Sequence, residues 1–393
     1  MNPSMPGKEE SPPCKFAKLE KTAEKIPRRK FAMLLSYSGT NYLGMQVQGT
    51  SSIPTIEGEL LNALSATGYI DAEEKAKPSS FKFQRAARTD KGVSAARQVC
   101  SFKIPVSDLK TFSLTLNQRL PKAIRVMGIQ RVTKSFDAKN ACSSRTYAYV
   151  LPSFSFESNG EDESAISSFR LPKEKLDKIN EVLGIFEGTH NFFNFTSNRK
   201  SDDKSCIRYI MKCRCQDPFV EKGVEFVTIL LDGQSFMLHQ IRKMVGLCIA
   251  VVRGLVDSDI IPTAFSCPQH MDLPKAPALG LLLLRVNYDW YNERYGSTHK
   301  PLDWSDESER VDEFYSKIIL SDIIEREMSE KSMLNWLKTL PLHSFKVKPC
   351  GPLPDPDNSQ DSDRPKSSSE TKNSELSQES PAALEQNTCD DSD

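Results

Sequence analysis

Long apolar runs are absent from this 393-residue sequence. The longest candidate, residues 244–252, has fewer than half of the roughly 20 residues that a membrane-spanning helix needs, so we expect no membrane partner. The first residues include Glu9 and Glu10 and no apolar core. We therefore expect neither a secretory signal nor a typical transit peptide there.

Cofactor-binding motifs are also missing. No Gly-Lys-Ser/Thr follows the early glycines Gly39, Gly44 and Gly49, and neither a dinucleotide fingerprint nor a His-Glu-x-x-His metal motif occurs. These absences disfavour chemistry that depends on a nucleotide, a redox group or a metal. We expect the protein to work with no cofactor.

Cysteine is too sparse for a disulfide framework, with ten residues in a long chain. Cys213 and Cys215 are two residues apart, so both thiols would face the same side of a strand. Burial of reduced thiols is the simpler interpretation. A zinc site that also uses Cys206 is the alternative, although the spacing matches no zinc ribbon. The composition indicates a reducing compartment, the cytosol or the nucleus.

A net charge of zero hides an uneven distribution of charge. Residues 349–393 hold eleven acidic and three basic residues, which gives −8, so the remaining 49 basic and 41 acidic residues give +8. A basic body with an acidic tail fits a polyanionic partner, although the excess is modest for about 350 residues.

Both ends of the chain lack the apolar content of a folded domain. Residues 1–29 are polar and basic and residues 349–393 are rich in Ser, Asp, Glu, Pro and Gln, so we expect both to be disordered. The basic cluster at residues 25–30 fits either a nuclear-import signal or a solvated approach to the first strand. The folded body is expected between these tails.

Alternating and helical apolar patterns follow one another through the body. Strands are predicted over residues 31–37, 98–105, 124–132, 145–151, 208–216, 224–231 and 279–288. Helices are predicted over 55–68, 109–120, 172–186, 238–252 and 319–337. Residues 153–168 are expected to form a polar surface insertion. Strands and helices in both halves favour an α/β or α+β fold with two related lobes.

One carboxylate, Asp90, stands among basic residues in a Thr-Asp-Lys-Gly turn just before a predicted strand. Its basic neighbours in sequence are Arg85, Arg88, Lys91, Arg97 and Lys103. Nearby cations favour the ionised carboxylate and should keep its pKa low. At the tip of a loop, such a group acts as a nucleophile or stabilises charge. A surface cluster of ion pairs is the alternative interpretation.

A second candidate segment, residues 236–246, joins a strand to a helix. Arg242 adjoins the apolar face that Ile241 and Val245 mark, so it either pairs with a buried carboxylate or extends along the surface towards water. His239 is expected to form a hydrogen bond or to contact RNA. A metal role is disfavoured because no set of ligands lies near it in sequence.

Aromatic residues mark two further segments. Arg145, Tyr147 and Tyr149 lie on one face of a predicted strand, where a tyrosine either packs in the core or stacks on a nucleobase. Residues 188–195 form an aromatic cluster, for which packing is the simpler interpretation.

In this order along the chain, these segments resemble the tRNA pseudouridine synthases typified by the bacterial enzyme called A. The matching landmarks are Tyr37-Ser38-Gly39, Gly44-Met45-Gln46, residues 85–95, Arg145-Thr146-Tyr147-Ala148-Tyr149, Gly188-Thr189-His190-Asn191-Phe192, residues 238–246, and Ala276-Pro277-Ala278-Leu279-Gly280-Leu281. The resemblance covers about residues 30–295 and leaves both tails outside.

The eukaryotic branch of that family is the most similar. Met45 stands where bacterial members usually have Trp, and Ser94 stands where they usually have His. The insertion at residues 153–168 and the extension past Tyr291, with Pro301-Leu302-Asp303-Trp304, point to the same branch.

The resemblance implies an α+β fold. In it, two ferredoxin-like (RRM-like) lobes share a central mixed, mainly antiparallel sheet, with helices on one side and an RNA-binding cleft between the lobes. The N-terminal catalytic lobe, with the Asp loop, would span residues 30–140 and the C-terminal catalytic lobe residues 141–295. A C-terminal helical extension would follow over residues 296–348.

The resemblance also implies roles for individual residues. Asp90 would be the essential aspartate, and Arg242 would pair with it. Arg88 would hold the target nucleotide out of the helix, and Tyr147 would pack against the flipped uracil and relay a proton. The remaining substrate-binding candidates are Leu281 and Leu283, as an apolar floor under the base, and His239.

The implied reaction is the isomerisation of uridine to pseudouridine. The C1′–N1 bond breaks and C1′ is rejoined to C5 in a closed pocket, with no metal or redox cofactor. Asp90 either attacks C1′ or assists proton removal at the sugar, and the sequence leaves both open. The expected partners are tRNA, at uridines of the anticodon stem, and other RNAs such as mRNA.

Other functions fit parts of the sequence. They are a sibling synthase specific for the anticodon loop, a non-catalytic RNA-binding or chaperone protein with the same fold, and the zinc protein described above. A monomer is favoured, because the eukaryotic insertions would block the dimer interface of bacterial relatives. The expected location is the nucleus, with the mitochondrion or cytoplasm as further sites.

Overall fold

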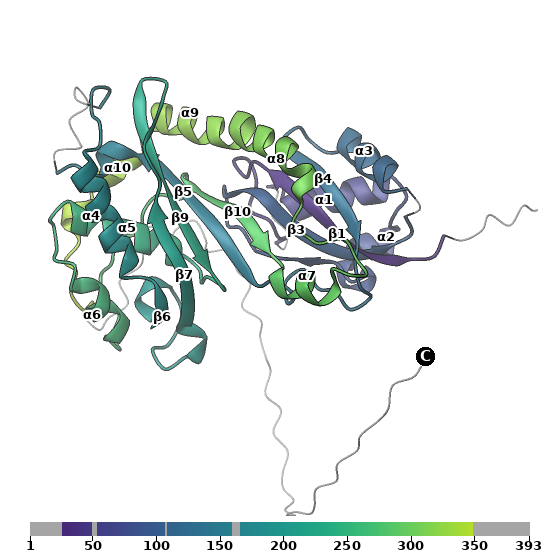
Figure 1. Cartoon of the computed structure of the whole chain (residues 1–393), viewed down its shortest axis with the longest axis horizontal. Coiled ribbons are helices and arrows are strands. Elements are labelled where there is room, and N and C mark those ends of the chain that lie inside the picture. Colours follow the sequence, from purple (N-terminus) through teal and green to yellow (C-terminus); the bar gives the residue numbers. More distant parts are fainter. Residues whose placement is uncertain (1–25, 49–52, 107, 159–165, 349–393) are drawn as a thin grey trace, which may run out of the picture. The chain divides into compact units, whose positions relative to one another are not determined.

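A computed structural model describes residues 26–48, 53–106, 108–158 and 166–348 (Figure 1). The two predicted disordered tails therefore lie outside the described residues, except for residues 26–29. The described residues through Lys348 belong to one compact unit. The basic cluster at residues 25–30 is partly built into this unit, because Lys30 is buried in the first strand and donates a hydrogen bond to Lys82 O at 2.8 Å.

A single mixed sheet runs through the described residues, in the order β4–β1–β3–β10–β5–β9–β7–β6, with β2 beside β3 and β8 beside β9. Among the strand pairs of these described ranges, only the pairing of β10 with β3 is parallel. The strands are β1 (Arg29–Tyr37), β2 (Gln84–Arg85), β3 (Ser94–Ile104), β4 (Ile124–Arg131), β5 (Ser144–Pro152), β6 (Gly188–Asn191), β7 (Ile207–Cys215), β8 (Phe219–Glu221), β9 (Val224–Gly233) and β10 (Leu281–Asn287). The predicted α+β class and mainly antiparallel sheet are confirmed.

Helices accompany both halves of the sheet. They are α1 (Ile56–Ala66), α2 (Ala72–Ala76), α3 (Leu109–Arg119), α4 (Lys173–Gly184), α5 (Gln240–Val252), α6 (Ile260–Ser266), α7 (Asp289–Tyr295), α8 (Ser308–Phe314), α9 (Ser321–Glu330) and α10 (Ser332–Leu337). The helix predicted from Thr55 begins as expected, because the Thr55 side chain accepts a hydrogen bond from Gly58 N and caps α1. No helix in the described ranges is long and apolar enough to cross a membrane.

Strand β10 joins the two halves of the sheet. It comes last in the chain, yet it lies between β3 and β5, where Leu283 is paired with Ala95 on one side and with Tyr147 on the other. Strands β4, β1 and β3 therefore belong to the N-terminal half and β5, β9, β7 and β6 to the C-terminal half. The proposed lobe boundaries at residues 140 and 295 stay a prediction.

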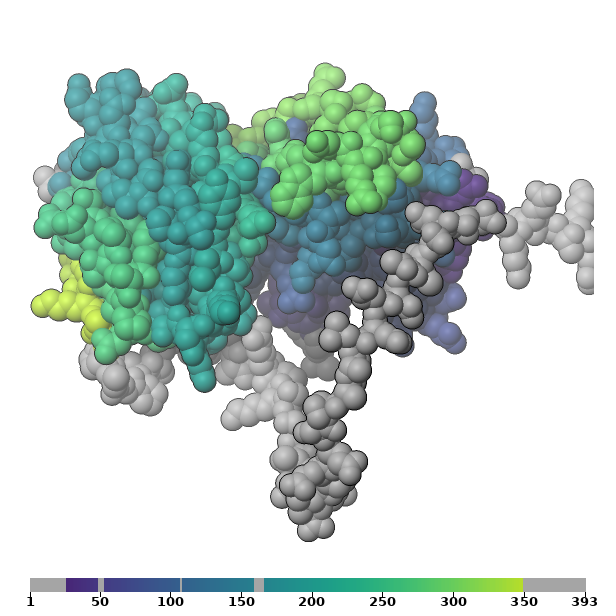
Figure 2. Space-filling model, turned by 60° about the horizontal axis from the view of Figure 1, so that its bottom comes forward, coloured from purple at the N-terminus to yellow at the C-terminus, as the bar shows by residue number. Residues whose placement is uncertain are grey.

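The C-terminal extension is an exception to the expected placement of helices on one side. Phe31 is paired with Phe102, whose ring lies 6.3 Å from that of Phe112 in α3. Leu34, three residues further along β1, points to the opposite face. Its partner Gly128 lies against Glu307, just before α8. Figure 2 shows the segment after β10, in green, lying over the blue N-terminal half.

Two local predictions are wrong. The insertion at residues 153–168 does not begin on the surface, because Phe154 and Phe156 form a buried turn; its centre, residues 159–165, lies outside the described residues. The single helix predicted over 319–337 is divided between a π-helical segment (Tyr315–Leu320), α9 and α10. The break falls at Lys331, which has a left-handed backbone with φ of 51°.

Candidate active site

The paired strands β10 and β5, at the centre of the sheet, bring several predicted site residues together. Leu281 is paired with Tyr149 and Leu283 with Tyr147, so these four side chains share one face of the sheet. Leu283 is fully buried, whereas Leu281 and Tyr147 keep 8% and 9% of their surface exposed. Of the two leucines predicted to lie under a base, Leu281 is therefore the more accessible.

Residues 86–93, here called the Asp90 loop, reach this face just before β3. Within the loop Arg88 and Asp90 are exposed, and Thr89 between them is buried. The hydroxyl groups of Thr89 and Tyr37 share a buried hydrogen bond of 2.8 Å. This anchor turns Thr89 into the core and the two charged neighbours outwards.

Gln98 of β3 fixes the beginning of the Asp90 loop. This fully buried side chain donates to Ala87 O at 2.9 Å and accepts from Ala87 N at 3.1 Å. The side-chain amide of Gln98 thus pairs with both the N–H and the C=O group of Ala87. Gln98 was not among the predicted site residues, because its alternating position in a strand gives no sign of a contact with a preceding loop.

A second loop supports Asp90 from the side of α1. Met45 N donates to Thr89 O at 3.1 Å, and Glu57 N of α1 donates to Met45 O at 2.9 Å. Gly44 has φ of +98°, and a Cβ there would lie 2.6 Å from Thr89 O. Only glycine satisfies both the backbone conformation and this close approach. The landmark Gly44-Met45 is therefore part of the support of the Asp90 loop.

Two of the five basic residues that neighbour Asp90 in the sequence form ion pairs with other carboxylates. Arg85 forms an ion pair with Glu57 at 3.1 Å. Arg97 forms an ion pair with Asp312 of α8 at 2.7 Å. Nearness in the sequence did not predict these ion pairs, because side chains along an extended segment point in different directions and meet different partners. Burial raises the pKa of Glu57, and Arg85, the hydrogen bond from Val47 N and, least of all, Arg88 oppose this rise, so Arg88 lies within electrostatic reach of Glu57.

Tyr147 lies within electrostatic reach of Asp90. Burial raises the pKa of Tyr147 to about 12; Arg145 opposes this shift, and the carboxylate of Asp90 adds to it. The ring packs edge-on against Phe236, with 5.2 Å between centroids. Tyr147 is therefore a protonated phenol at neutral pH, able to donate a hydrogen bond but not to act as a base.

Arg242 enters the same face from the first turn of α5. Its Nε donates to Ala276 O at 2.6 Å, and Ala276 N donates to Arg242 O at 3.1 Å. Burial raises the pKa of Tyr149, and Arg242 is the largest opposing influence. Asp90 thus influences the pKa of Tyr147, and Arg242 influences that of Tyr149, which lies two residues further along β5. The predicted direct pairing of Asp90 with Arg242 stays a prediction.

His239 lies directly before α5 and is half-buried. It has a left-handed backbone with φ of 64°. Its Nδ1 lies 3.4 Å from Ser197 Oγ. A role as a hydrogen-bonding residue fits this position, and its predicted contact with RNA stays a prediction. In the part of the chain that the structure describes, no group of three His, Cys, Asp or Glu residues could hold a metal ion. Cys206, Cys213 and Cys215 are buried thiols that form no such group, which is contrary to the zinc alternative.

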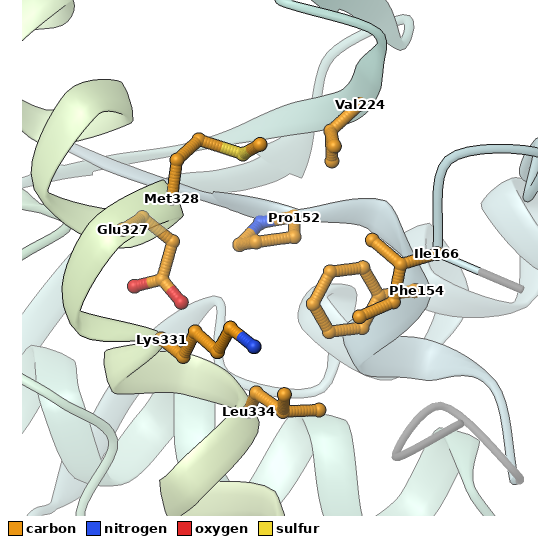
Figure 3. A pocket seen from close by; sticks show the side chains of 8 residues that line it. All are labelled: Pro152, Phe154, Ile166, Val224, Glu327, Met328, Lys331 and Leu334. Carbon is orange, nitrogen blue, oxygen red and sulfur yellow. The ribbon is translucent and has the colours of Figure 1, made fainter. Parts of the chain in front are cut away.

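A cavity of about 80 Å³ lies away from these residues, beneath α9 and α10 (Figure 3). Its lining residues are Pro152, Phe154, Ile166, Val224, Glu327, Met328, Lys331 and Leu334. None of them is a predicted site residue, and a space of this size holds a few water molecules rather than a nucleoside. We therefore place the candidate site at the centre of the sheet.

The central arrangement suits a reaction on a planar, uncharged base. It combines an exposed carboxylate on a braced loop, an apolar surface from Leu281, a phenol that stays protonated, and an arginine fixed by a backbone carbonyl. The carboxylate can attack an electrophilic carbon or take a proton. The phenol and the apolar side chain can hold an aromatic ring.

Comparison with known proteins identifies relatives over most of the chain. The profile of the family described as tRNA pseudouridine synthase matches residues 183–289. Pseudouridylate synthase 1 homolog from Mus musculus is 44% identical over 329 residues, which cover 83% of this chain and 77% of the relative. The Homo sapiens protein of the same name is 44% identical over 316 residues, 80% of this chain and 73% of the relative. The tRNA pseudouridine synthase 1 of Candida albicans is 34% identical over 78% of this chain and 65% of its own length.

Proposed function

The chain belongs to the tRNA pseudouridine synthase family, whose members are isomerases that act on tRNA, and we propose that Asp90 is its essential catalytic carboxylate. The single observation that carries this proposal is the position of Asp90. It is an exposed carboxylate that influences the pKa of Tyr147, at the sheet centre where Leu281 and Leu283 also lie.

The other predicted residues receive roles that fit their positions. Tyr147 and Leu281 hold the uracil between them, because both keep exposed surface on the same sheet face. Arg242 orients Asp90 from the start of α5. Arg88, exposed beside Asp90, occupies the space that the target nucleotide leaves in the RNA helix.

The reaction is an isomerisation, so its atoms balance without a co-reactant. The C1′–N1 bond breaks, the uracil rotates, C1′ bonds to C5, and the proton lost from C5 is matched by one gained at N1. Asp90 acts at the sugar, as the nucleophile at C1′ or as the base that removes a sugar proton. Tyr147 donates its hydroxyl proton in a hydrogen bond to the detached base, because its raised pKa keeps it protonated.

The test uses the full-length protein and a tRNA transcript. The variants Asp90→Asn and Asp90→Ala are expected to form no pseudouridine and to bind the transcript as tightly as wild type. Asp232→Asn, a change to a half-buried carboxylate that accepts a hydrogen bond from Thr146 on β5, serves as the control and is expected to retain turnover. A normal rate from Asp90→Asn would overturn the proposal, and a loss of binding would indicate an RNA-binding role instead.

We further propose that the target uridines lie in the anticodon stem of tRNA and in other RNAs such as mRNA, and that the protein acts as a monomer in the nucleus. A pseudouridine map of tRNA and mRNA from cells that lack this protein tests the substrates. Loss confined to the anticodon loop would favour the sibling activity. Cell fractionation tests the location, for which the cluster at residues 25–30 is poor support because Lys30 is buried.

A further inference from the structure

We infer that Arg145 is a positioning residue that ties the Asp90 loop to the segment that carries His239 and leads into α5, where Arg242 lies. That segment, residues 234–239, connects β9 to α5 and is here called the β9–α5 connection. The inference rests on the proposed function, because it assumes that Asp90 and Arg242 act in one site.

The guanidinium of Arg145 contacts both segments. Its Nε and Nη2 donate to Ala86 O at 3.2 and 2.7 Å, and its Nη1 donates to Gln234 O at 3.0 Å. Ala86 is the first residue of the Asp90 loop and Gln234 is the first residue of the β9–α5 connection. One planar group therefore holds the beginning of each segment.

The sheet makes this link only indirectly, through β10 and β5. Strand β3, which follows the Asp90 loop, and strand β5, which carries Arg145, are separated by β10. Strand β9 lies on the far side of β5. The backbone ladders therefore connect the two segments only by way of two intervening strands, whereas the Arg145 side chain bridges them directly.

Arginine suits this task better than lysine. Its donors lie on three nitrogens in a rigid plane, so two carbonyl groups in different directions are bound at once. A lysine has one nitrogen on a flexible stem and would hold one carbonyl firmly. The same guanidinium also opposes the burial-driven rise in the pKa of Tyr147, which places it at the site and not only at the sheet junction.

The test compares Arg145→Met and Arg145→Lys with wild type in single-turnover reactions at saturating protein. Loss of the link displaces Asp90 relative to Arg242, and a displacement of about 1 Å costs about a hundredfold in rate. We expect that loss for Arg145→Met, with an unchanged dissociation constant for the tRNA transcript. Arg145→Lys is expected to recover part of the rate.

A matched control is Arg125→Met. Arg125 Nη1 donates to Pro121 O and Ile124 O, both at 2.6 Å, at the β4 end of the sheet. This variant also removes a guanidinium from backbone carbonyls, yet its turnover should be unchanged. Hydrogen–deuterium exchange should accelerate in both the Asp90 loop and the β9–α5 connection of Arg145→Met, and in neither segment of Arg125→Met.

Two outcomes would overturn the inference. One is a folded Arg145→Met with the single-turnover rate of wild type; the other is a rate loss that Arg145→Met and Arg125→Met share equally, which would indicate general stability alone. Asp90→Asn is measured in parallel. If Asp90→Asn is inactive and Arg145→Met is normal, the proposed catalytic residue stands and the positioning role fails; an active Asp90→Asn contradicts the proposed function itself.

Discussion

Glu57 and Arg85 form an ion pair of 3.1 Å in which only 4% of the Glu57 side chain is exposed. The second oxygen of Glu57 accepts a hydrogen bond from Val47 N at 3.0 Å. This carboxylate therefore joins three elements: helix α1, the loop that contains Gly44 and Met45, and strand β2, which leads into the Asp90 loop.

Replacing Glu57 by Ala should destabilise the protein by about 3 kcal/mol or more, because it leaves the mostly buried Arg85 without its partner. The double variant Glu57→Leu with Arg85→Met should recover much of this loss. Urea denaturation measures both. The control is Glu181→Ala, which breaks the exposed pair with Lys178 and should cost less than about 1 kcal/mol. Equal losses of stability in Glu57→Ala and Glu181→Ala would show that burial does not strengthen the ion pair between Glu57 and Arg85.

Gly44 and Gly68 separate two effects of a glycine with positive φ. Both have such a backbone, at +98° and +75°, but an added Cβ lies 2.6 Å from Thr89 O at Gly44 and meets nothing within 4 Å at Gly68. Each change to Ala should cost roughly 1 kcal/mol of stability through backbone strain. Only Gly44→Ala should also lower the turnover number, because it pushes the Asp90 loop. Turnover measured well below both melting temperatures checks this, and a similar loss in both variants would refute it.

Tyr147 gives a prediction about pH. Its pKa is raised to about 12, so the phenol stays protonated throughout the working range and should add no alkaline limb to the rate profile below about pH 10. Tyr147→Phe should lower the rate by a constant factor across that range, and Tyr147→Leu should lower it further by removing the ring. Single-turnover rates from pH 6 to 10 provide the measurement. A limb near pH 9 that vanishes in Tyr147→Phe would show an ionising tyrosine.

Periodicity and turn chemistry predicted most of the strands and helices, because apolar alternation is a local property. Helix α1 and strand β1 begin within two residues of their predicted positions. The long-range partners were not predictable in this way. Nothing in the spacing of residues 84–97 distinguishes Arg85, which pairs with Glu57, from Arg97, which pairs with Asp312 of the C-terminal extension.

The candidate site shows the same limit. Ordered motifs singled out Asp90, Tyr147 and Arg242 as candidates, but Gln98 carries no motif, and only the fold shows that it lies against Ala87. Strand β6 was missed as well, since its four residues are too few for alternation to be recognised.

Glu327, whose carboxylate borders the cavity in Figure 3, is a buried acid with an unusual titration. Burial raises the pKa of Glu327 from its ordinary 4.5 to about 7, and the hydrogen bond from Met333 N at 2.7 Å opposes the shift only partly. A raised pKa means that the folded state favours the protonated acid. The stability that protonated Glu327 contributes to the folded state is therefore fully present below about pH 4.5 and is lost as the pH rises through about 7.

Glu327→Gln should consequently stabilise the protein above about pH 8 and change little near pH 4.5. The substituted amide keeps an oxygen that accepts from Met333 N, so only the penalty for a buried charge is removed, about 3 kcal/mol for a shift of this size. The melting temperature measured from pH 5 to 8.5 should show a gain that grows with pH. Glu325→Gln on the same helix is the control: Glu325 is exposed and its pKa is lowered by Lys222, so this variant should show no gain at any pH. A pH-independent gain in Glu327→Gln would mean that the cavity is filled better by the amide, and that the charge of Glu327 is not the cause.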